Sequence, residues 1–230
     1  GIPLPKTVFG HGFIYHSGEK MSKSLGNLVS PLEIADRWGA DPLRYYLTAI
    51  APEGQRTAFN FQHFIQRNND ELVAALGNFV HRSLTFVHKY FDGKVPEPGQ
   101  RAEPDTEQLA AIWNPPDEMA AELDACHFKA ALQLFMNGMR DANKYFDHKE
   151  PWVQRKQDLA ACGTTMNVCV NTIRTAAVLM APFLPFAAQT LQETLGLSDE
   201  EMMWDRCREE LPPGKPLAKP QILFRKIETE

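Results

Sequence analysis

From about residue 60 onward, apolar side chains recur at intervals of three and four residues, which is the spacing of one face of an α-helix. The first stripe predicts one long amphipathic helix from Asn60 to Phe91, ended by Asp92-Gly93. Later stripes predict helices over about 105–124 (restarted at Pro115), 128–146, 154–180 and 186–195. Four or five long helices joined by short links predict an antiparallel helical bundle.

The first 57 residues follow a different pattern. Two β-branched and aromatic runs, Thr7–Phe9 and Phe13–Tyr15, predict a strand or hairpin. Two short helices are expected next. Ser30 is placed to cap the first, which should end at Gly39, and Asp41 to cap the second.

These patterns predict a mainly α protein. A small fold of strand plus helices should occupy residues 1–57, and the antiparallel helical bundle residues 58–206. Residues 207–230 contain several prolines and a final apolar run, so we expect a C-terminal tail that packs on the body.

The composition narrows the possible functions. The 230 residues hold 24 Lys plus Arg against 29 Asp plus Glu, a formal charge of −5, which excludes a protein that coats nucleic acid by bulk charge. The longest apolar stretch, about 168–188, is interrupted by polar residues and prolines, so we expect a buried helix and no membrane partner. The four cysteines form no Cys-x-x-Cys pair, which favours a reducing cytosol, a cytoplasmic protein and no metal site. Since the chain starts at Gly1, we expect it to be a piece of a longer protein.

The sharpest chemical signal is the loop Lys20-Met21-Ser22-Lys23-Ser24, which lies between Gly18 and Gly26. Lysine carries a compact charge on a long stem, which suits contact with phosphate oxygens. The serines add hydroxyl donors. Such a loop can close over a triphosphate and stabilise charge while a phosphorus–oxygen bond breaks.

This pentapeptide resembles the signature loop of class I aminoacyl-tRNA synthetases, and the surrounding residues resemble the subgroup that activates Met, Ile, Leu, Val and Cys. The resemblance implies that the loop holds the phosphates of ATP with Mg²⁺. By the same resemblance Lys20 and Lys23 are catalytic, Lys23 contacts the phosphates most directly, and Ser22 assists. His11 is a further candidate for the ATP site, with a satisfied strand histidine as the alternative.

Two other positions have the chemistry needed to read RNA bases. Asn78 and Arg82 are four residues apart, so both project from one face of the predicted helix, and both offer donors suited to base edges. Pro151-Trp152 lies at a helix joint, where the indole can be presented to an unstacked base. A solvated polar face and a partly buried tryptophan are the structural alternatives.

The helical region resembles methionyl-tRNA synthetases most closely, and the resemblance rests on these runs: Asn68–Leu72, Leu76–Arg82, Lys89–Gly93, Pro151-Trp152 and Leu223–Glu228. This family ligates methionine to tRNA(Met). The resemblance implies that Asn78, Arg82, Pro151 and Trp152 recognise the CAU anticodon.

The resemblance covers only the second half of such an enzyme. An amino-acid pocket and the first half of a nucleotide-binding fold are missing from the sequence, so the N-terminal catalytic half is an expected partner and zinc, if any, lies there. We therefore expect the isolated fragment to be inactive. Three alternatives stay open: a stand-alone tRNA-binding module, a class I enzyme of another specificity such as the cysteinyl one, and a helical protein whose loop match is accidental.

Overall fold

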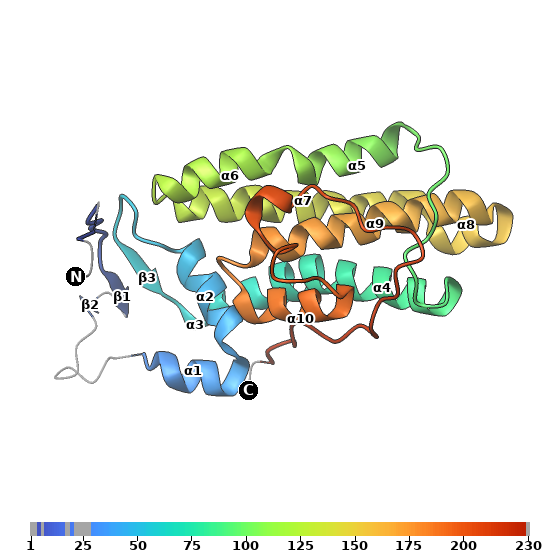
Figure 1. Ribbon diagram of the computed structural model, residues 1–230. Helices are drawn as coiled ribbons and strands as arrows, with labels where there is room; N and C mark the ends of the chain where they lie inside the picture. Colours follow the sequence, from blue (N-terminus) through green and yellow to red (C-terminus); the bar gives the residue numbers. More distant parts are fainter. Residues whose placement is uncertain (1–3, 6, 17–18, 21–28, 229–230) are drawn as a thin grey trace.

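The computed structural model describes residues 4–5, 7–16, 19–20 and 29–228, with Glu19–Lys20 described by backbone alone. Within those ranges the chain forms a small sheet followed by a helical bundle (Figure 1). The elements run in the order β1 (Ile14–His16), β2 (Glu19–Lys20), α1 (Pro31–Trp38), α2 (Ala40–Ala49), β3 (Thr57–Phe59), α3 (Phe61–Arg67), the π-helix η2 (Asn68–Gly77), α4 (Asn78–Tyr90), α5 (Glu103–Trp113), α6 (Pro115–Asp124), α7 (Phe128–Lys149), α8 (Pro151–Gln157), α9 (Leu159–Met180), α10 (Pro185–Leu195) and the 3₁₀-helix η3 (Trp204–Arg206). The predicted mainly helical fold is confirmed.

The described part of the sheet has the strand order β2-β1-β3. β1 pairs antiparallel with β2, and Tyr15 lies opposite Lys20. β1 also pairs parallel with β3, which the sequence pattern did not predict. The predicted strand at Thr7–Phe9 is wrong, because these residues are exposed and make no ladder.

The helix expected over Asn60–Phe91 is continuous but not uniformly α-helical. A π-helical stretch of 10 residues, η2, separates α3 from α4. Gly77 closes it, and a Cβ added there would lie 3.0 Å from the carbonyl oxygen of Leu72 and 3.4 Å from the ring of Phe224. The helix ends at the predicted place, since Asp92 and Gly93, just after α4, both have positive φ.

The two short N-terminal helices begin for different reasons. Ser30 caps α1 through its hydroxyl, which accepts a hydrogen bond from Glu33 N at 3.3 Å. Asp41 does not cap α2, and that prediction is wrong. Its buried carboxylate instead accepts from Ala187 N at 2.7 Å at the start of α10, so it joins the small fold to the bundle. Burial raises the pKa of Asp41, and the two backbone hydrogen bonds from α10 oppose that rise.

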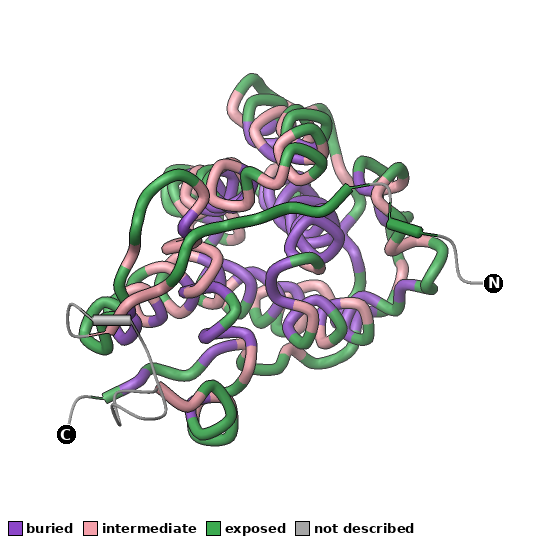
Figure 2. The backbone as a smooth tube through the Cα atoms, turned by 90° about the vertical axis from the view of Figure 1, so that its left-hand side faces the viewer, coloured by how far each residue is buried: buried purple, intermediate pink, exposed green. Residues whose placement is uncertain are grey.

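The bundle is built around α9, which is buried from Cys162 to Met180. Viewed along the bundle, buried backbone gathers at the centre and exposed backbone at the rim (Figure 2). A second, smaller apolar cluster lies between α1, α2, β3 and α3 and contains Ile34, Leu43, Tyr46, Phe59, Phe64, Ile65 and Ile227.

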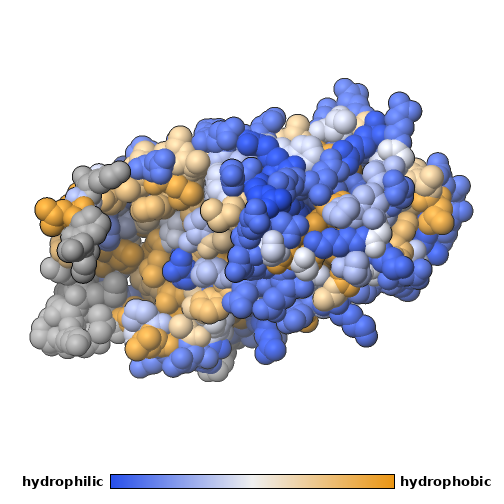
Figure 3. All heavy atoms as spheres, viewed as in Figure 1, coloured by the Kyte–Doolittle hydropathy of each residue, from blue (hydrophilic) through white to orange (hydrophobic). Residues whose placement is uncertain are grey.

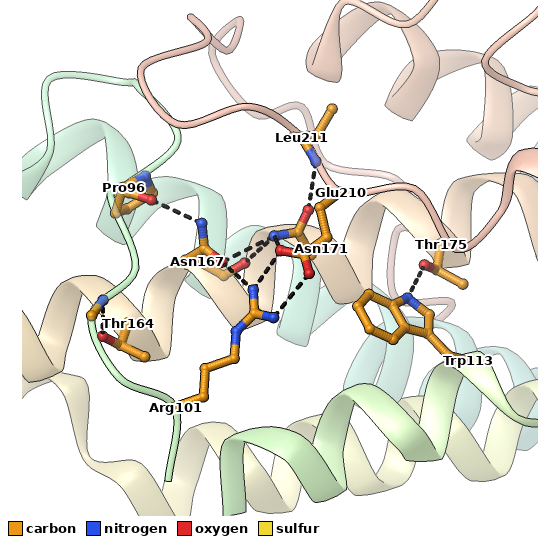
Figure 4. Close-up of polar contacts among 10 residues, drawn as sticks. Pro96, Arg101, Trp113, Thr164, Asn167, Asn171, Thr175, Glu210 and Leu211 are labelled. Atoms are coloured by element: carbon orange, nitrogen blue, oxygen red, sulfur yellow. Dashed lines mark hydrogen bonds and ion pairs between the residues drawn. The ribbon is translucent and has the colours of Figure 1, made fainter.

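Polar side chains of α9 fasten two irregular segments to the core (Figure 4). Asn167 donates to Pro96 O at 2.9 Å, and Asn171 accepts from Leu211 N at 2.8 Å. Arg101 joins them by an ion pair with Glu210 and a 3.1 Å hydrogen bond to Asn167. The segment after α10 therefore lies on the bundle, and its last residues pair with η2: Asn69 and Ile227 exchange two hydrogen bonds of 2.9 Å.

Candidate functional site: a nucleic-acid interface

The loop Lys20–Ser24 falls largely outside the described residues. Ser22 and Lys23 are not described, and of Lys20 only the backbone is, in β2 opposite Tyr15. The predicted phosphate site of these residues therefore stays a prediction.

His11 lies in an exposed segment rather than in a strand, and its Nδ1 is 2.8 Å from Gly12 O. It borders a cavity of about 250 Å³ between the small fold and the first residue of α7, lined also by Phe9, Pro52, Glu53 and Phe128. Its role at ATP stays a prediction.

The candidate RNA site lies at the opposite end of the molecule from the sheet, where α4, α7 and α8 meet (Figure 1). Pro151 and Trp152 begin α8 as its first turn, so this helix is a separate element and not part of α9. Glu150 has φ 44, a left-handed backbone that turns the chain sharply between α7 and α8. The turn places Trp152 at a helix start, as the sequence suggested.

Pro151 and Trp152 have opposite environments. Pro151 is buried, and its carbonyl accepts a hydrogen bond from the Cys162 thiol, with 3.4 Å between sulfur and oxygen. Burial raises the pKa of that thiol to about 11, so it stays protonated and can donate. Trp152 is 41% exposed, which excludes an indole packed wholly inside the protein. Pro151 therefore anchors the turn that presents the indole.

Arg82 reaches the same surface from α4. Its Cζ lies 4.5 Å from the centroid of the Phe146 ring, and that ring lies 6.0 Å from the ring of Trp152. Asp147 holds the guanidinium by an ion pair of 2.7 Å. One carboxylate oxygen engages only one of the five N–H donors of an arginine, so donors remain for a ligand. The structure thus brings Arg82 and Trp152 together through Phe146.

Asn78 begins α4 and is exposed, one helical turn before Arg82. The structure places it on the same side of α4. Sequence reasoning overlooked Phe146 and Asp147, although both stand shortly before the Pro151-Trp152 pair in the chain.

A buried ionic group stabilises the turn between α7 and α8. Asp105 of α5, 2% exposed, pairs with Lys149 Nζ at 2.7 Å and accepts from the Tyr145 hydroxyl at 2.7 Å. Burial by itself would raise the pKa of Asp105, but the hydrogen bonds from Lys149, Tyr145 and Ala102 N outweigh it and lower the pKa below the usual value. Lys149 is the last residue of α7, so this ion pair fixes the helix end that precedes Trp152.

The described residues contain neither a metal-binding cluster nor a membrane-spanning helix. Among the described residues, no group of three or more His, Cys, Asp or Glu side chains has the arrangement of a metal site. None of the described helices combines the length and apolarity that crossing a bilayer needs.

Two known protein families match the N-terminal and the C-terminal parts of the chain. Residues 1–84 match the family described as tRNA synthetases class I (M), and residues 95–230 match the anticodon binding domain of methionyl tRNA ligase. The part of the candidate RNA site on α7 and α8 lies within the second match, and its α4 residues Asn78 and Arg82 lie within the first.

Individual relatives agree. The chain is 41% identical to the methionine–tRNA ligase of Pyrococcus abyssi, over 97% of this chain and 31% of the relative, and 36% identical to that of Brucella suis, over 97% and 44%. A crystal structure of Mycobacterium tuberculosis methionyl-tRNA synthetase bound by methionyl-adenylate superposes with a TM-score of 0.91 at 36% identity, covering 97% of this chain and 45% of that one. The chain therefore spans less than half the length of these relatives. It belongs to the methionyl-tRNA synthetase family and carries part of the class I catalytic domain followed by the anticodon-binding domain.

Proposed function

We propose that this chain is part of a methionine–tRNA ligase and supplies two of its functions: a loop for the ATP phosphates and recognition of the CAU anticodon of tRNA(Met). The whole enzyme forms methionyl-adenylate from methionine and Mg-ATP and then transfers the methionyl group to tRNA. The N-terminal catalytic half completes the active site, so the isolated chain is inactive in methionine activation. The four cysteines are all free thiols, which supports a cytoplasmic location.

One observation supports anticodon recognition most strongly: a half-exposed indole and a guanidinium both lie next to the same phenylalanine ring. An unstacked base can stack on Trp152, while Arg82 and Asn78 bind the edges of bases beside it. Because Asp147 and Phe146 hold Arg82 in place before RNA arrives, little side-chain entropy is lost on binding. Base contacts, rather than bulk charge, give the selectivity of a protein with net charge −5.

For the loop, the support is the match of residues 1–84 to the class I synthetases, together with the chemistry of its two lysines. Lys23 contacts the ATP phosphates with help from Lys20 and Ser22, and His11 lies at the edge of the same site. The positive charges of the two lysines stabilise the negative charge that develops as pyrophosphate leaves.

The test is a binding titration of the 230-residue chain with an anticodon stem-loop carrying CAU and with stem-loops carrying one changed anticodon base. We expect tight binding of CAU and about 1–3 kcal/mol weaker binding for each changed base. Arg82→Lys should reduce this selectivity, because an ammonium group lacks the planar fork. Equal affinity for all the stem-loops would refute anticodon recognition, and a preference for a cysteine anticodon would assign the chain to a cysteinyl enzyme.

Activation is tested separately. The isolated chain should show no methionine-dependent pyrophosphate exchange, whereas the full-length protein that contains it should. Exchange by the isolated chain would contradict the assignment of an incomplete active site. A native reading frame with no catalytic half upstream would favour a stand-alone tRNA-binding module.

A further inference from the structure

A second cationic group lies beside the proposed anticodon site and belongs to neither motif. Arg155 of α8 follows Trp152 by three residues, so the two side chains project from neighbouring positions on one helix face. On α4, Arg82, Phe86 and Tyr90 follow one another at intervals of four residues and also share a face. Trp152 lies next to Phe146 of α7, which contacts Arg82 on this face of α4. Arg155 contacts the same face directly, at Tyr90.

The contact between Arg155 and Tyr90 is close. The guanidinium carbon lies 4.2 Å from the centroid of the tyrosine ring, and the ring of Phe86 lies 4.6 Å from that of Tyr90. Lys89 Nζ lies 5.2 Å from the same centroid, so two positive charges gather around one ring. Stacking on an aromatic ring fixes the plane of a guanidinium while its N–H donors still point outward around the edge.

The hydrogen-bonding capacity of Arg155 is unused. Arg82, Arg101 and Arg208 each pair with a carboxylate. Within the part of the chain that the structure describes, Arg155 forms no ion pair or hydrogen bond, and its buried Nε has no partner. A fixed guanidinium with unpaired donors next to an ammonium group is suited to bind a phosphate.

The end of the molecule that holds this group is also partly apolar. Leu159, at the start of α9, is 59% exposed, and apolar side chains are visible at this end in the space-filling view (Figure 3). The surface therefore offers aromatic and apolar contacts together with positive charge, the combination that single-stranded RNA requires.

We infer that Arg155, held over the ring of Tyr90 and assisted by Lys89, binds a backbone phosphate of the RNA strand next to the anticodon. This inference rests on the proposed anticodon function and extends it, because the contact contributes affinity without reading a base. Phosphate contacts fix the register of RNA on a protein, and base contacts select its sequence.

The experiment compares Arg155→Ala with Lys156→Ala in the complete 230-residue chain. Lys156 is the adjacent residue, exposed and of the same charge, which makes it a matched control. We expect Arg155→Ala to weaken binding of the CAU stem-loop about tenfold, with the same factor for a stem-loop carrying a changed base. The slope of log K against log salt should fall by about 0.7–0.9, the value of one phosphate contact, and Lys156→Ala should change neither quantity.

Two further variants sharpen the result. Arg155→Lys keeps the charge but loses the planar guanidinium and its fork of donors, so we expect an intermediate loss of affinity. Tyr90→Leu should weaken binding, and combining it with Arg155→Ala should add little, because both remove the same contact. A stem-loop in which single phosphates are replaced by neutral methylphosphonates should bind the native chain weakly at one linkage, and Arg155→Ala should remove that sensitivity.

Three outcomes overturn the inference. Equal binding by Arg155→Ala and Lys156→Ala removes Arg155 from the interface. A loss of discrimination between CAU and the changed anticodon in Arg155→Ala shows a base contact rather than a phosphate contact. If the native chain binds no stem-loop, the proposed anticodon function itself fails and the phosphate site fails with it, whereas in the first two outcomes anticodon recognition stands.

Discussion

At the scale of single residues, the proposed anticodon site combines residues that the fold holds in place with residues that are exposed. Pro151 is buried and hydrogen-bonded through its carbonyl, and Arg82 is held by a carboxylate and a ring. Trp152 and Asn78 are exposed and free to meet a ligand. Substitutions of the exposed residues should therefore change RNA binding with little effect on folding, and substitutions of the residues held in place should change both.

Trp152→Ala tests one of the exposed residues. Loss of the stacking surface should weaken binding of the CAU stem-loop by about 1–3 kcal/mol. Because the indole is 41% exposed and its ring lies 6.0 Å from that of Phe146, the free energy of unfolding should fall by only about 1 kcal/mol. Leu32→Ala, which removes an exposed apolar side chain of α1 in the small fold, is the control and should leave RNA affinity within about twofold. Unchanged RNA binding in Trp152→Ala would remove the indole from the site.

Asp105→Asn tests the support beneath the turn. The variant leaves Lys149 without its carboxylate in a buried setting, so at pH 7 the free energy of unfolding should fall by about 3–5 kcal/mol. The pKa of Asp105 is lowered in the folded state, so its stabilisation is complete above the unfolded pKa of about 4 and is lost as the pH falls through the lower folded pKa. The free energies of unfolding of the native chain and the variant, measured in urea, should therefore approach each other as the pH falls from about 4 through that lower folded pKa. A stability difference that does not depend on pH would contradict this assignment.

At the scale of the helices and strands, local signals predicted local structure and tertiary contacts decided the rest. Ser30 caps α1 because cap, proline and first turn are adjacent in sequence. Asp41 carries the same signal, but its carboxylate caps α10, about 145 residues later, which no local pattern contains. The π-helix η2 was also hidden, since an apolar stripe at intervals of three and four residues predicts an α-helix and carries no signal for the wider i→i+5 turn of a π-helix.

In the candidate site, too, local sequence signals predicted some residues, and tertiary contacts decided the others. Trp152 was predictable because the Pro-Trp pair at a helix joint is a local feature, and Arg82 because of its spacing from Asn78. Phe146 and Asp147 were not, because their importance lies in contacts between α7, α4 and α8. The Arg155–Tyr90 contact depends equally on the packing of two helices far apart in sequence.

Asn69→Asp tests how η2 holds the C-terminal segment. A carboxylate can still accept from Ile227 N, but it cannot donate to Ile227 O, so one of the two hydrogen bonds is replaced by repulsion between oxygens. Loss of about 1 kcal/mol should raise the released fraction of the segment about fivefold. Trypsin cleavage after Arg225 and Lys226, followed by mass spectrometry, measures this fraction. Asp70→Asn, the adjacent exposed position, should leave the cleavage rate unchanged, and an equal rate in all three proteins would contradict the anchoring role of Asn69.

At the scale of the whole molecule, the small sheet and the indole lie at opposite ends of an elongated bundle (Figure 1). The proposed chemistry is divided in the same way, with nucleotide contacts near one end and RNA bases at the other. Two sites this far apart should respond independently to substitutions that leave the fold intact.

Lys23→Ala and Trp152→Ala, each made in the full-length protein, should separate the two sites. Lys23→Ala should lower methionine-dependent pyrophosphate exchange by about a hundredfold or more and leave stem-loop affinity unchanged. Trp152→Ala should weaken tRNA binding and leave exchange nearly unchanged. Equal losses in both assays for either variant would argue against two separate sites.

The length of α7 sets the distance between the small fold and the indole of Trp152. Its first turn is held by Glu53, whose carboxylate accepts from Lys129 N at 2.9 Å, and its last residue is held by Asp105 just before the indole. Twenty-two helical residues at about 1.5 Å each make a rod of about 33 Å. The number of helical turns therefore sets the distance between the two ends. One turn more or fewer would displace the indole by about 5.4 Å, roughly 1.6 times the spacing of about 3.4 Å between stacked bases.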